Sequence, residues 1–172
     1  MWSTECSLSR TGPQYDLFMA HASLQIRPIH EGDFDRWREL WNGYLAFYET
    51  TLDAEITNLT WNRILDSSHA FRCFVALYGD RIIGFAHCFI RPSTWSKNGY
   101  CYLEDLFVDP QNRGVGAGRA LIDAVISYAR SEKAGRVYWT TKENNLTARK
   151  LYDSYLPKSE FVQYRLPQIY EQ

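Results

Sequence analysis

The sequence lacks several features that would define its class at once. No apolar run approaches the roughly 20 residues of a membrane-spanning helix, since the longest, residues 82–90, already contains Gly84 and His87. There is no basic surplus, because 19 lysines and arginines stand against 20 acidic residues, and this argues against a general nucleic-acid binder. The first 14 residues have no apolar core typical of a signal peptide. We therefore expect a cytoplasmic protein, or alternatively a nuclear one, with no direct nucleic-acid or membrane partner.

Paired cysteines and clustered metal ligands are also missing. The four cysteines, at positions 6, 73, 88 and 101, have no tight spacing, and three of them fall in strand-like apolar segments. Buried reduced thiols explain this pattern better than disulfides or a metal site. The four histidines show no H-E-x-x-H spacing, so no metal is expected. The G-x-S-x-G segment of a serine hydrolase is absent as well.

Aromatic residues, in contrast, are abundant. The 172 residues include 9 Phe, 6 Trp and 12 Tyr, which excludes a disordered chain and predicts a core built from rings. A chain of this length buries a sufficient core without disulfides. We expect a single domain over residues 23–172, preceded by a loosely ordered extension over residues 1–22.

Hydrophobic periodicity predicts strands and helices in alternation. Asp33 and Asn145 are well placed to cap helices, and Gly79 and Gly99 fall at predicted turns between strands. Strands are predicted over 24–27, 72–78, 81–90, 100–108, 136–141 and 161–166, and helices over 33–48, 58–66, 145–155 and from 117 to before Gly135. The order β-α-α-β-β-β-α-β-α-β describes an α/β (α+β) domain around a mixed sheet.

The most informative segment runs from Asp109 to Arg119, D-P-Q-N-R-G-V-G-A-G-R, between a predicted strand and a predicted long helix. Glycines there leave room for a ligand, and the unpaired N–H groups and positive dipole at the helix start suit a pyrophosphate. A tight turn that only packs the helix against the sheet is an equally open interpretation. A dinucleotide-binding loop fits poorly, because Arg119 stands at its third glycine. A P-loop fits poorly too, because its Gly-Lys-Ser/Thr ending is missing.

Three motifs together resemble one family. Residues 111–116 (Q-N-R-G-V-G) look like the Q/R-x-x-G-x-G/A signature of the GNAT superfamily, the acetyl-CoA-dependent N-acetyltransferases. Residues 145–152 (N-L-T-A-R-K-L-Y) resemble that family's N-x-x-A-x-x-L-Y helix. Residues 102–108 are similar to a strand of the diamine (spermidine/spermine) and fungal histone/polyamine acetyltransferases. The resemblance covers about residues 23–166 and implies a mixed central sheet flanked by helices.

The resemblance also implies roles for individual positions. The backbone of Leu106, Phe107 and Val108 would pair with the pantetheine arm of acetyl-CoA like an added strand and polarise the thioester carbonyl. Asn145 and Ala148 would flank the coenzyme, and Tyr152 would also contact it and give its phenolic proton to the leaving thiolate. The pyrophosphate would be held by the loop, which consists of Arg113, Gly114, Val115, Gly116, Ala117, Gly118 and Arg119. A core tyrosine in an amphipathic helix is the structural alternative for Tyr152.

Two adjacent carboxylates near the end of the predicted central strand are candidates for the general base. An alkylamine has a pKa of about 10.4 and must lose a proton before it attacks a thioester. Glu104 or Asp105 would accept that proton directly or through water. Because side chains alternate along a strand, only one of the two is expected to face the active site, and we favour Glu104. A structural ion pair is the alternative explanation of these carboxylates.

Charge and aromatic residues indicate a cationic acceptor. Residues 31–55 include seven acidic and two basic residues, interleaved with aromatic side chains. Acidic and aromatic walls suit an ammonium group. We expect the acceptor to contact Trp41, Tyr44, Glu104, Asp105 and Trp139. A solvated helix face with an aromatic core stripe produces the same pattern, so both interpretations stay open.

The sequence therefore predicts an enzyme that moves the acetyl group of acetyl-CoA to a primary amine by direct attack in a ternary complex. The acceptor is expected to be a polyamine, a lysine-like small molecule or a protein lysine. The alternative is a non-catalytic acetyl-CoA-binding sensor or interaction module. An exposed terminal strand over residues 161–166 would favour a homodimer.

Overall fold

The computed structural model describes residues 23–166. The predicted extension over residues 1–22 lies outside this range, and so does Cys6. The chain divides into two compact units, Met1–Trp139 and Thr140–Gln172. A single domain over residues 23–172 stays a prediction.

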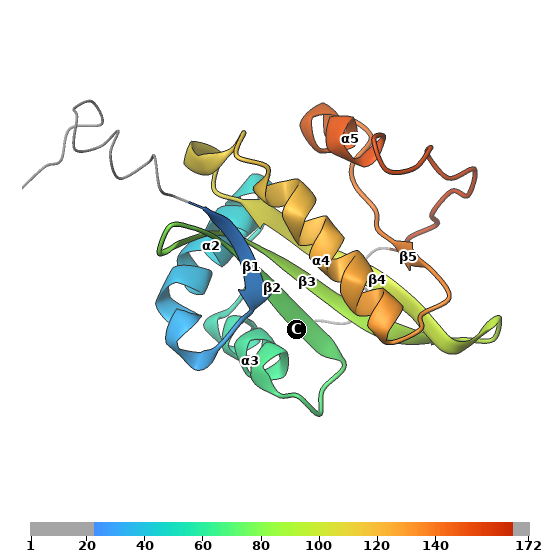
Figure 1. Cartoon of the computed structure of the whole chain (residues 1–172), viewed down its shortest axis with the longest axis horizontal. Helices are drawn as coiled ribbons and strands as arrows, with labels where there is room; N and C mark the ends of the chain where they lie inside the picture. Colours follow the sequence, from blue (N-terminus) through green and yellow to red (C-terminus); the bar gives the residue numbers. More distant parts are fainter. Residues whose placement is uncertain (1–22, 167–172) are drawn as a thin grey trace, which may run out of the picture. The chain divides into compact units, whose positions relative to one another are not determined.

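The first unit contains a five-stranded mixed sheet in the order β1-β2-β3-β4-β5 (Figure 1). The first four strands are antiparallel neighbours, whereas β5 runs parallel to β4. The strands are β1 Leu24–Pro28, β2 Phe71–Tyr78, β3 Arg81–Ser93, β4 Ser96–Val108 and β5 Val137–Tyr138. The mixed sheet confirms the fold class, but the strand predicted over residues 136–141 is reduced to two residues.

The turn predicted at Gly99 is wrong. The hairpin between β3 and β4 turns at residues 94–95, and Gly99 lies inside β4 next to an irregularity in the strand register. Its φ of 71° is in the left-handed region, and an added Cβ would meet the carbonyl oxygen of Arg91 at 2.2 Å. The glycine therefore permits a local bulge with close approach of the two strands, which a turn signal does not distinguish from a hairpin loop.

Helices cover both faces of the sheet in this unit. Side chains of β2 alternate between the faces, so that Phe74 contacts Tyr128 of α4 while Val75 packs under α2 and α3. Figure 1 shows α4 lying across the sheet. The helical elements are η1 Glu31–Asp33, α2 Phe34–Phe47, α3 Ala54–Leu65, η2 Pro110–Asn112 and α4 Ala117–Ser131. Among the described residues, no helix has the length and apolar character needed to cross a membrane.

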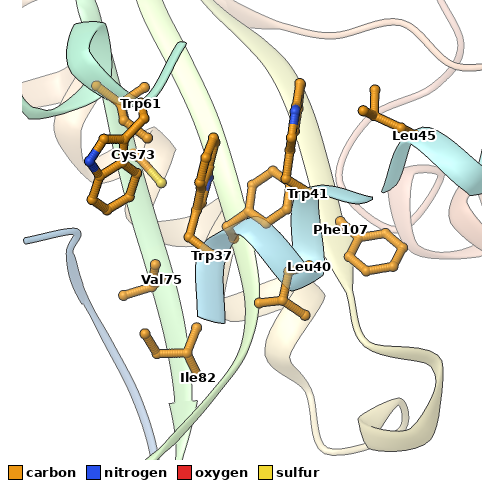
Figure 2. Close-up of a cluster of buried hydrophobic side chains, with 11 residues drawn as sticks. Trp37, Leu40, Trp41, Leu45, Trp61, Cys73, Val75, Ile82 and Phe107 are labelled. Atoms are coloured by element: carbon orange, nitrogen blue, oxygen red, sulfur yellow. The ribbon is translucent and has the colours of Figure 1, made fainter. Parts of the chain in front are cut away.

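Aromatic rings build the core between the sheet and helices α2 and α3 (Figure 2). Trp37 is fully buried, and its ring centroid lies 5.8 Å from that of Trp41 and 5.1 Å from that of Trp61. Most aromatic residues of α2 thus form a core stripe, which was one of the two interpretations of this segment, whereas Phe47 is exposed. Cys73, Cys88 and Cys101 are buried free thiols, as predicted.

The second unit contains one helix, α5 Leu146–Tyr152, among its described residues. Asn145 caps it as predicted, accepting a hydrogen bond from the Ala148 N–H at 3.4 Å. The strand predicted over residues 161–166 is wrong, because this segment has no strand partner among the described residues and its apolar side chains are exposed. Alternating apolar residues form a strand only where a neighbouring strand pairs with them. The homodimer prediction was based on an exposed strand at this position, so it no longer has that basis.

Asp33 connects β1 to α2 in a way that the sequence did not predict. Its carboxylate does not cap α2 but accepts two hydrogen bonds from Arg27, at 2.6 and 2.8 Å, and one from the His30 N–H at 2.9 Å. Burial raises the pKa of Asp33, but the bonds from Arg27 and His30 outweigh it, so the pKa lies below its ordinary value of 3.8. The ion pair therefore stabilises the fold while Asp33 is ionised.

We expect Asp33→Asn to lower the free energy of unfolding by about 2–3 kcal/mol at pH 7, because it leaves the partly buried Arg27 without its counter-ion. A depressed folded-state pKa contributes stability that is present above the ordinary pKa and is lost as pH falls through the folded value. The difference in unfolding free energy between wild type and variant should therefore persist down to about pH 5 and shrink below about pH 4. Urea denaturation across this range measures it, with Asp35→Asn, at an exposed pair, as the near-neutral control. An equal deficit at pH 7 and pH 3 would contradict this role.

Candidate active site

The glycine loop joins the end of β4 to the start of α4. Gly114 and Gly116 have φ values of 90° and 86°, in the left-handed region that favours glycine. A Cβ added at Gly114 would meet nothing within 4 Å, so this glycine does not serve close packing. Helix α4 begins directly after Gly116, and its first N–H groups have no acceptor within the helix. The loop therefore has the backbone shape and the open donors of an anion cradle.

Arg36 of α2 anchors the entry to this loop. Its guanidinium donates to Asp109 at 2.8 Å and to the carbonyl oxygen of Ile82 at 2.8 Å. Asp109 in turn accepts a hydrogen bond from the Gln111 N–H at 3.1 Å. Burial raises the pKa of Asp109, but the bonds from Gln111 and Arg36 outweigh it and lower the pKa. This anchor was missed in the sequence, since nothing local connects positions 36 and 109.

The end of β4 has one open edge. Leu106, Phe107 and Val108 pair with β3 on one side. On the other side, β5 pairs only with Cys101 and Tyr102. Within residues 23–166, the β4 backbone beyond Tyr102 thus has no strand partner on that side, and an extended ligand fits there as an added strand.

A β-bulge interrupts the pairing of β3 with β4. His87 is paired with Asp105 and the next residue, Cys88, with Leu103, so Glu104 is the extra residue on β4. Glu104 and Asp105 both line the same pocket. The expectation that only one of them faces the site is wrong, because strict alternation holds only in a regular strand.

This pocket has a volume of about 200 Å³ and lies within the first unit. It brings together three of the residues predicted to bind the acceptor, namely Trp41, Glu104 and Asp105, whereas Tyr44 and Trp139 are not part of its wall. The lining consists of Trp41, Leu52, Thr60, Arg63, Ile64, Phe71, His87, Glu104 and Asp105. No acidic residue of the segment 31–55 contributes to it. In the described part of the chain, no group of three or more His, Cys, Asp or Glu side chains is placed to hold a metal ion.

A hydrogen-bond network fixes the buried side of the pocket. The indole N–H of Trp37 donates to His87 Nε2 at 3.1 Å, and His87 Nδ1 lies 3.0 Å from Asp105 Oδ2. Because an indole only donates, Nε2 is the acceptor and Nδ1 carries the proton donated to Asp105. The two hydrogen bonds therefore select one tautomer of the ring. His87 was missed as a site residue, although a single polar residue within the longest apolar run was a usable signal.

Tyr44 reinforces this network from α2. Burial raises the pKa of Tyr44 far above its ordinary value, and the charge and hydrogen bonding of Asp105 raise it further. The phenol therefore stays protonated and donates to the carboxylate. Tyr44, predicted to touch the acceptor, interacts with Asp105 but does not itself line the pocket.

The second unit carries the remaining predicted site residues. Asn145 uses its oxygen for the cap on Ala148, and its amide donates to Thr141 Oγ1 at 3.0 Å. Tyr152 is the last residue of α5 and is half-buried. The capped helix thus has a defined start, which fixes the spacing from Asn145 to Tyr152 at two helical turns.

Comparison with known proteins identifies the family of this chain. The acetyltransferase (GNAT) family model matches residues 34–156. The chain is 31% identical over 152 residues to the D-amino-acid N-acetyltransferase HPA3 of Saccharomyces cerevisiae, covering 86% of this chain and 92% of that protein. It is 33% identical over 134 residues to the thialysine N-epsilon-acetyltransferase of Caenorhabditis elegans, covering 78% and 75%. The solved structure of AAC(6')-Iy with a CoA-containing bisubstrate analogue has a TM-score of 0.74 at 20% identity, covering 86% of this chain and 99% of that one.

The chain therefore belongs to the GNAT acetyltransferase family. As such it is an acetyl-CoA-dependent N-acetyltransferase that acts on amines, which confirms the predicted family and enzyme class. Acetyl-CoA fits the residues present, since the glycine loop offers a cradle for its pyrophosphate and the open edge of β4 offers a partner for its pantetheine arm.

We expect His87 to lose its fixed tautomer in Trp37→Phe, because the change removes the hydrogen-bond donor to Nε2. Stability should fall by about 2–4 kcal/mol from the lost hydrogen bond and ring volume. Trp61→Phe is the matched control, since Trp61 packs in the same cluster without a hydrogen bond to His87. Nitrogen-15 NMR of the histidine rings should show an Nδ1–H tautomer for His87 in the wild type and the control, and a changed signal in Trp37→Phe. A doubly protonated His87 in the wild type at pH 7 would contradict the network.

Proposed function

We propose that this enzyme acetylates a small primary amine by direct attack on acetyl-CoA in a ternary complex. One observation carries the proposal, namely that a single strand supplies both halves of the site. Glu104 and Asp105 line the pocket, while the open edge of β4 continues over residues 106–108, about 3.3 Å further per residue. An amine in the pocket would thus lie next to a thioester bound at that edge.

Glu104 is proposed as the general base. It is exposed, so water reaches it, and it lines the pocket as the extra residue of the bulge. Asp105 accepts a hydrogen bond from His87 Nδ1 and interacts with Tyr44 on the buried side of the pocket. We assign Asp105 the role of a fixed negative charge that attracts the ammonium group, and Glu104 the removal of its proton.

Acetyl-CoA supplies the reactive thioester, and the remaining roles fall to this chain. The N–H groups of the first turn of α4, together with Arg113 and Arg119, would hold the pyrophosphate. Backbone groups of residues 106–108 would hold the pantetheine arm and donate to the thioester carbonyl. Asn145 and Ala148 are proposed to flank the coenzyme, and Tyr152 to protonate the leaving thiolate.

The pocket favours a small acceptor among the predicted classes. Its volume of about 200 Å³ is below the roughly 300–1,000 Å³ of pockets that enclose drug-sized ligands. The names of two relatives, a D-amino-acid and a thialysine acetyltransferase, support small amines as acceptors. A lysine-like small molecule or a short polyamine therefore fits better than an aminoglycoside.

The test is release of the CoA thiol from acetyl-CoA with spermidine, free lysine, a lysine-bearing peptide and an aminoglycoside as acceptors. We expect small amines to accelerate release, and Tyr152→Phe to lower kcat by about tenfold or more with little change in the KM for acetyl-CoA. Tyr164→Phe, at an exposed tyrosine of the same unit, is the control. Unchanged turnover in Tyr152→Phe would remove Tyr152 as the acid. Acetyl-CoA binding without release for any amine would favour the non-catalytic sensor.

Glu104→Gln is expected to lower kcat/KM about 100-fold at pH 7, because a positioned base is lost. The deficit should shrink as pH rises toward the amine's pKa of about 10, where free amine needs no base. The measurement is a pH–rate profile of both enzymes with the best acceptor. Glu132→Gln, at an exposed residue after α4, serves as the matched control. A wild-type rate in Glu104→Gln across the pH range would contradict its role.

A further inference from the structure

The acceptor pocket contains a cation that the acetyl transfer described above does not use. Arg63 lines the pocket together with Glu104 and Asp105. Arg27 and Arg36 have carboxylate partners, and Arg72 donates to three carbonyl oxygens. Arg63 forms no ion pair or hydrogen bond with any residue between 23 and 166. Its guanidinium is therefore available to an anionic group in the pocket.

Helix α3 holds Arg63 at a fixed place in the pocket wall. Thr60, Arg63 and Ile64 are spaced three and four residues apart and share one helix face. Ile64 is buried, and Trp61 on the same helix packs against Trp37. The backbone that carries Arg63 is thus anchored in the core, and Thr60 adds a hydroxyl to the same wall.

The pocket consequently offers both signs of charge on different elements. Two carboxylates come from β4 and one guanidinium from α3. A polyamine carries several ammonium groups and no anion, so a second ammonium in this small pocket would be repelled by Arg63. A molecule with one amine and one carboxylate has a partner of opposite charge on each side of the pocket, the amine facing the two carboxylates and the carboxylate facing Arg63. An arginine binds a carboxylate through two parallel hydrogen bonds.

We propose that the acceptor is an amino acid whose carboxylate binds Arg63 while its amine faces Glu104 and Asp105. The inference rests on the proposed function and narrows its substrate class. Leu52, Ile64 and Phe71 provide apolar surface for the carbon chain between the two charged ends. Arg63 is then the residue that selects amino acids against polyamines.

The experiment compares three acceptors that share one carbon chain. Lysine carries the carboxylate, lysinamide replaces it with a neutral amide, and cadaverine lacks it. Thiol release from acetyl-CoA gives kcat/KM for each with the wild type, Arg63→Gln, Arg63→Lys and the control Arg130→Gln. Arg130 is exposed at the end of α4 and does not line the pocket.

We expect the wild type to prefer lysine over lysinamide and cadaverine by about tenfold or more, the range of a charge-assisted hydrogen bond. In Arg63→Gln this preference should fall by about the same factor, mainly through the KM for lysine. Arg63→Lys should restore part of it, because a point charge replaces the planar fork. Arg130→Gln should keep the wild-type preference.

The outcomes separate this inference from the proposed function. A preference for cadaverine or spermidine, or a lysine preference that survives Arg63→Gln, overturns the amino-acid assignment while transfer to amines stands. The same holds if lysine and lysinamide react equally well in the wild type. No acetylation of any amine overturns the proposed function itself, and the inference with it.

Discussion

The β-bulge at Glu104 is the constraint on which the site depends. In a regular antiparallel pair, adjacent residues of β4 would point to opposite faces of the sheet. The extra residue re-aims the strand so that Glu104 and Asp105 share one pocket. It lies on the open edge of β4, two residues before residues 106–108. A single local irregularity thus places the proposed base, the proposed fixed charge and the proposed docking edge on one strand.

The network behind the bulge explains why we propose different parts for the two carboxylates. The buried core is connected to Asp105 through Trp37, His87 and Tyr44. Each polar group of these three side chains has a partner. No buried side-chain polar atom in the described residues lacks a hydrogen bond. A satisfied buried network is rigid, since moving one member leaves the others unpaired. Glu104 is exposed to solvent, where the proposed base would exchange its proton with water.

Several features that depend on neighbouring residues were predictable from the sequence, although the cap at Asp33 and the turn at Gly99 were not correct. The glycine loop, the cap at Asn145 and the amphipathic α4 each have a signal within about ten residues, and the structure has the elements where these signals placed them. The aromatic stripe of α2 was recognised, but the sequence did not show which of its residues belong to the core and which to the pocket. In the structure Trp37 is fully buried and Trp41 lines the pocket.

Features that depend on distant residues were not predictable. The pairings of Arg36 with Asp109 and of Trp37 with His87 join residues 73 and 50 positions apart, and no local pattern encodes them. The bulge follows from the register between β3 and β4, and the presence of Glu104 in the sequence does not predict that register. The strand expected at 161–166 failed for the same reason, because alternation indicates a potential strand but does not supply its partner.

Helix α2 has a consequence for how the two ligands influence each other. Within 14 residues it carries Arg36, which anchors the entry to the glycine loop, Trp37, which holds His87, and Trp41, which forms part of the pocket. Because a packed helix moves as one body, a coenzyme bound at the loop as proposed would also restrict the pocket wall. Thermodynamic linkage would make this effect reciprocal, so that α2 would couple the free energies of the proposed coenzyme and acceptor binding.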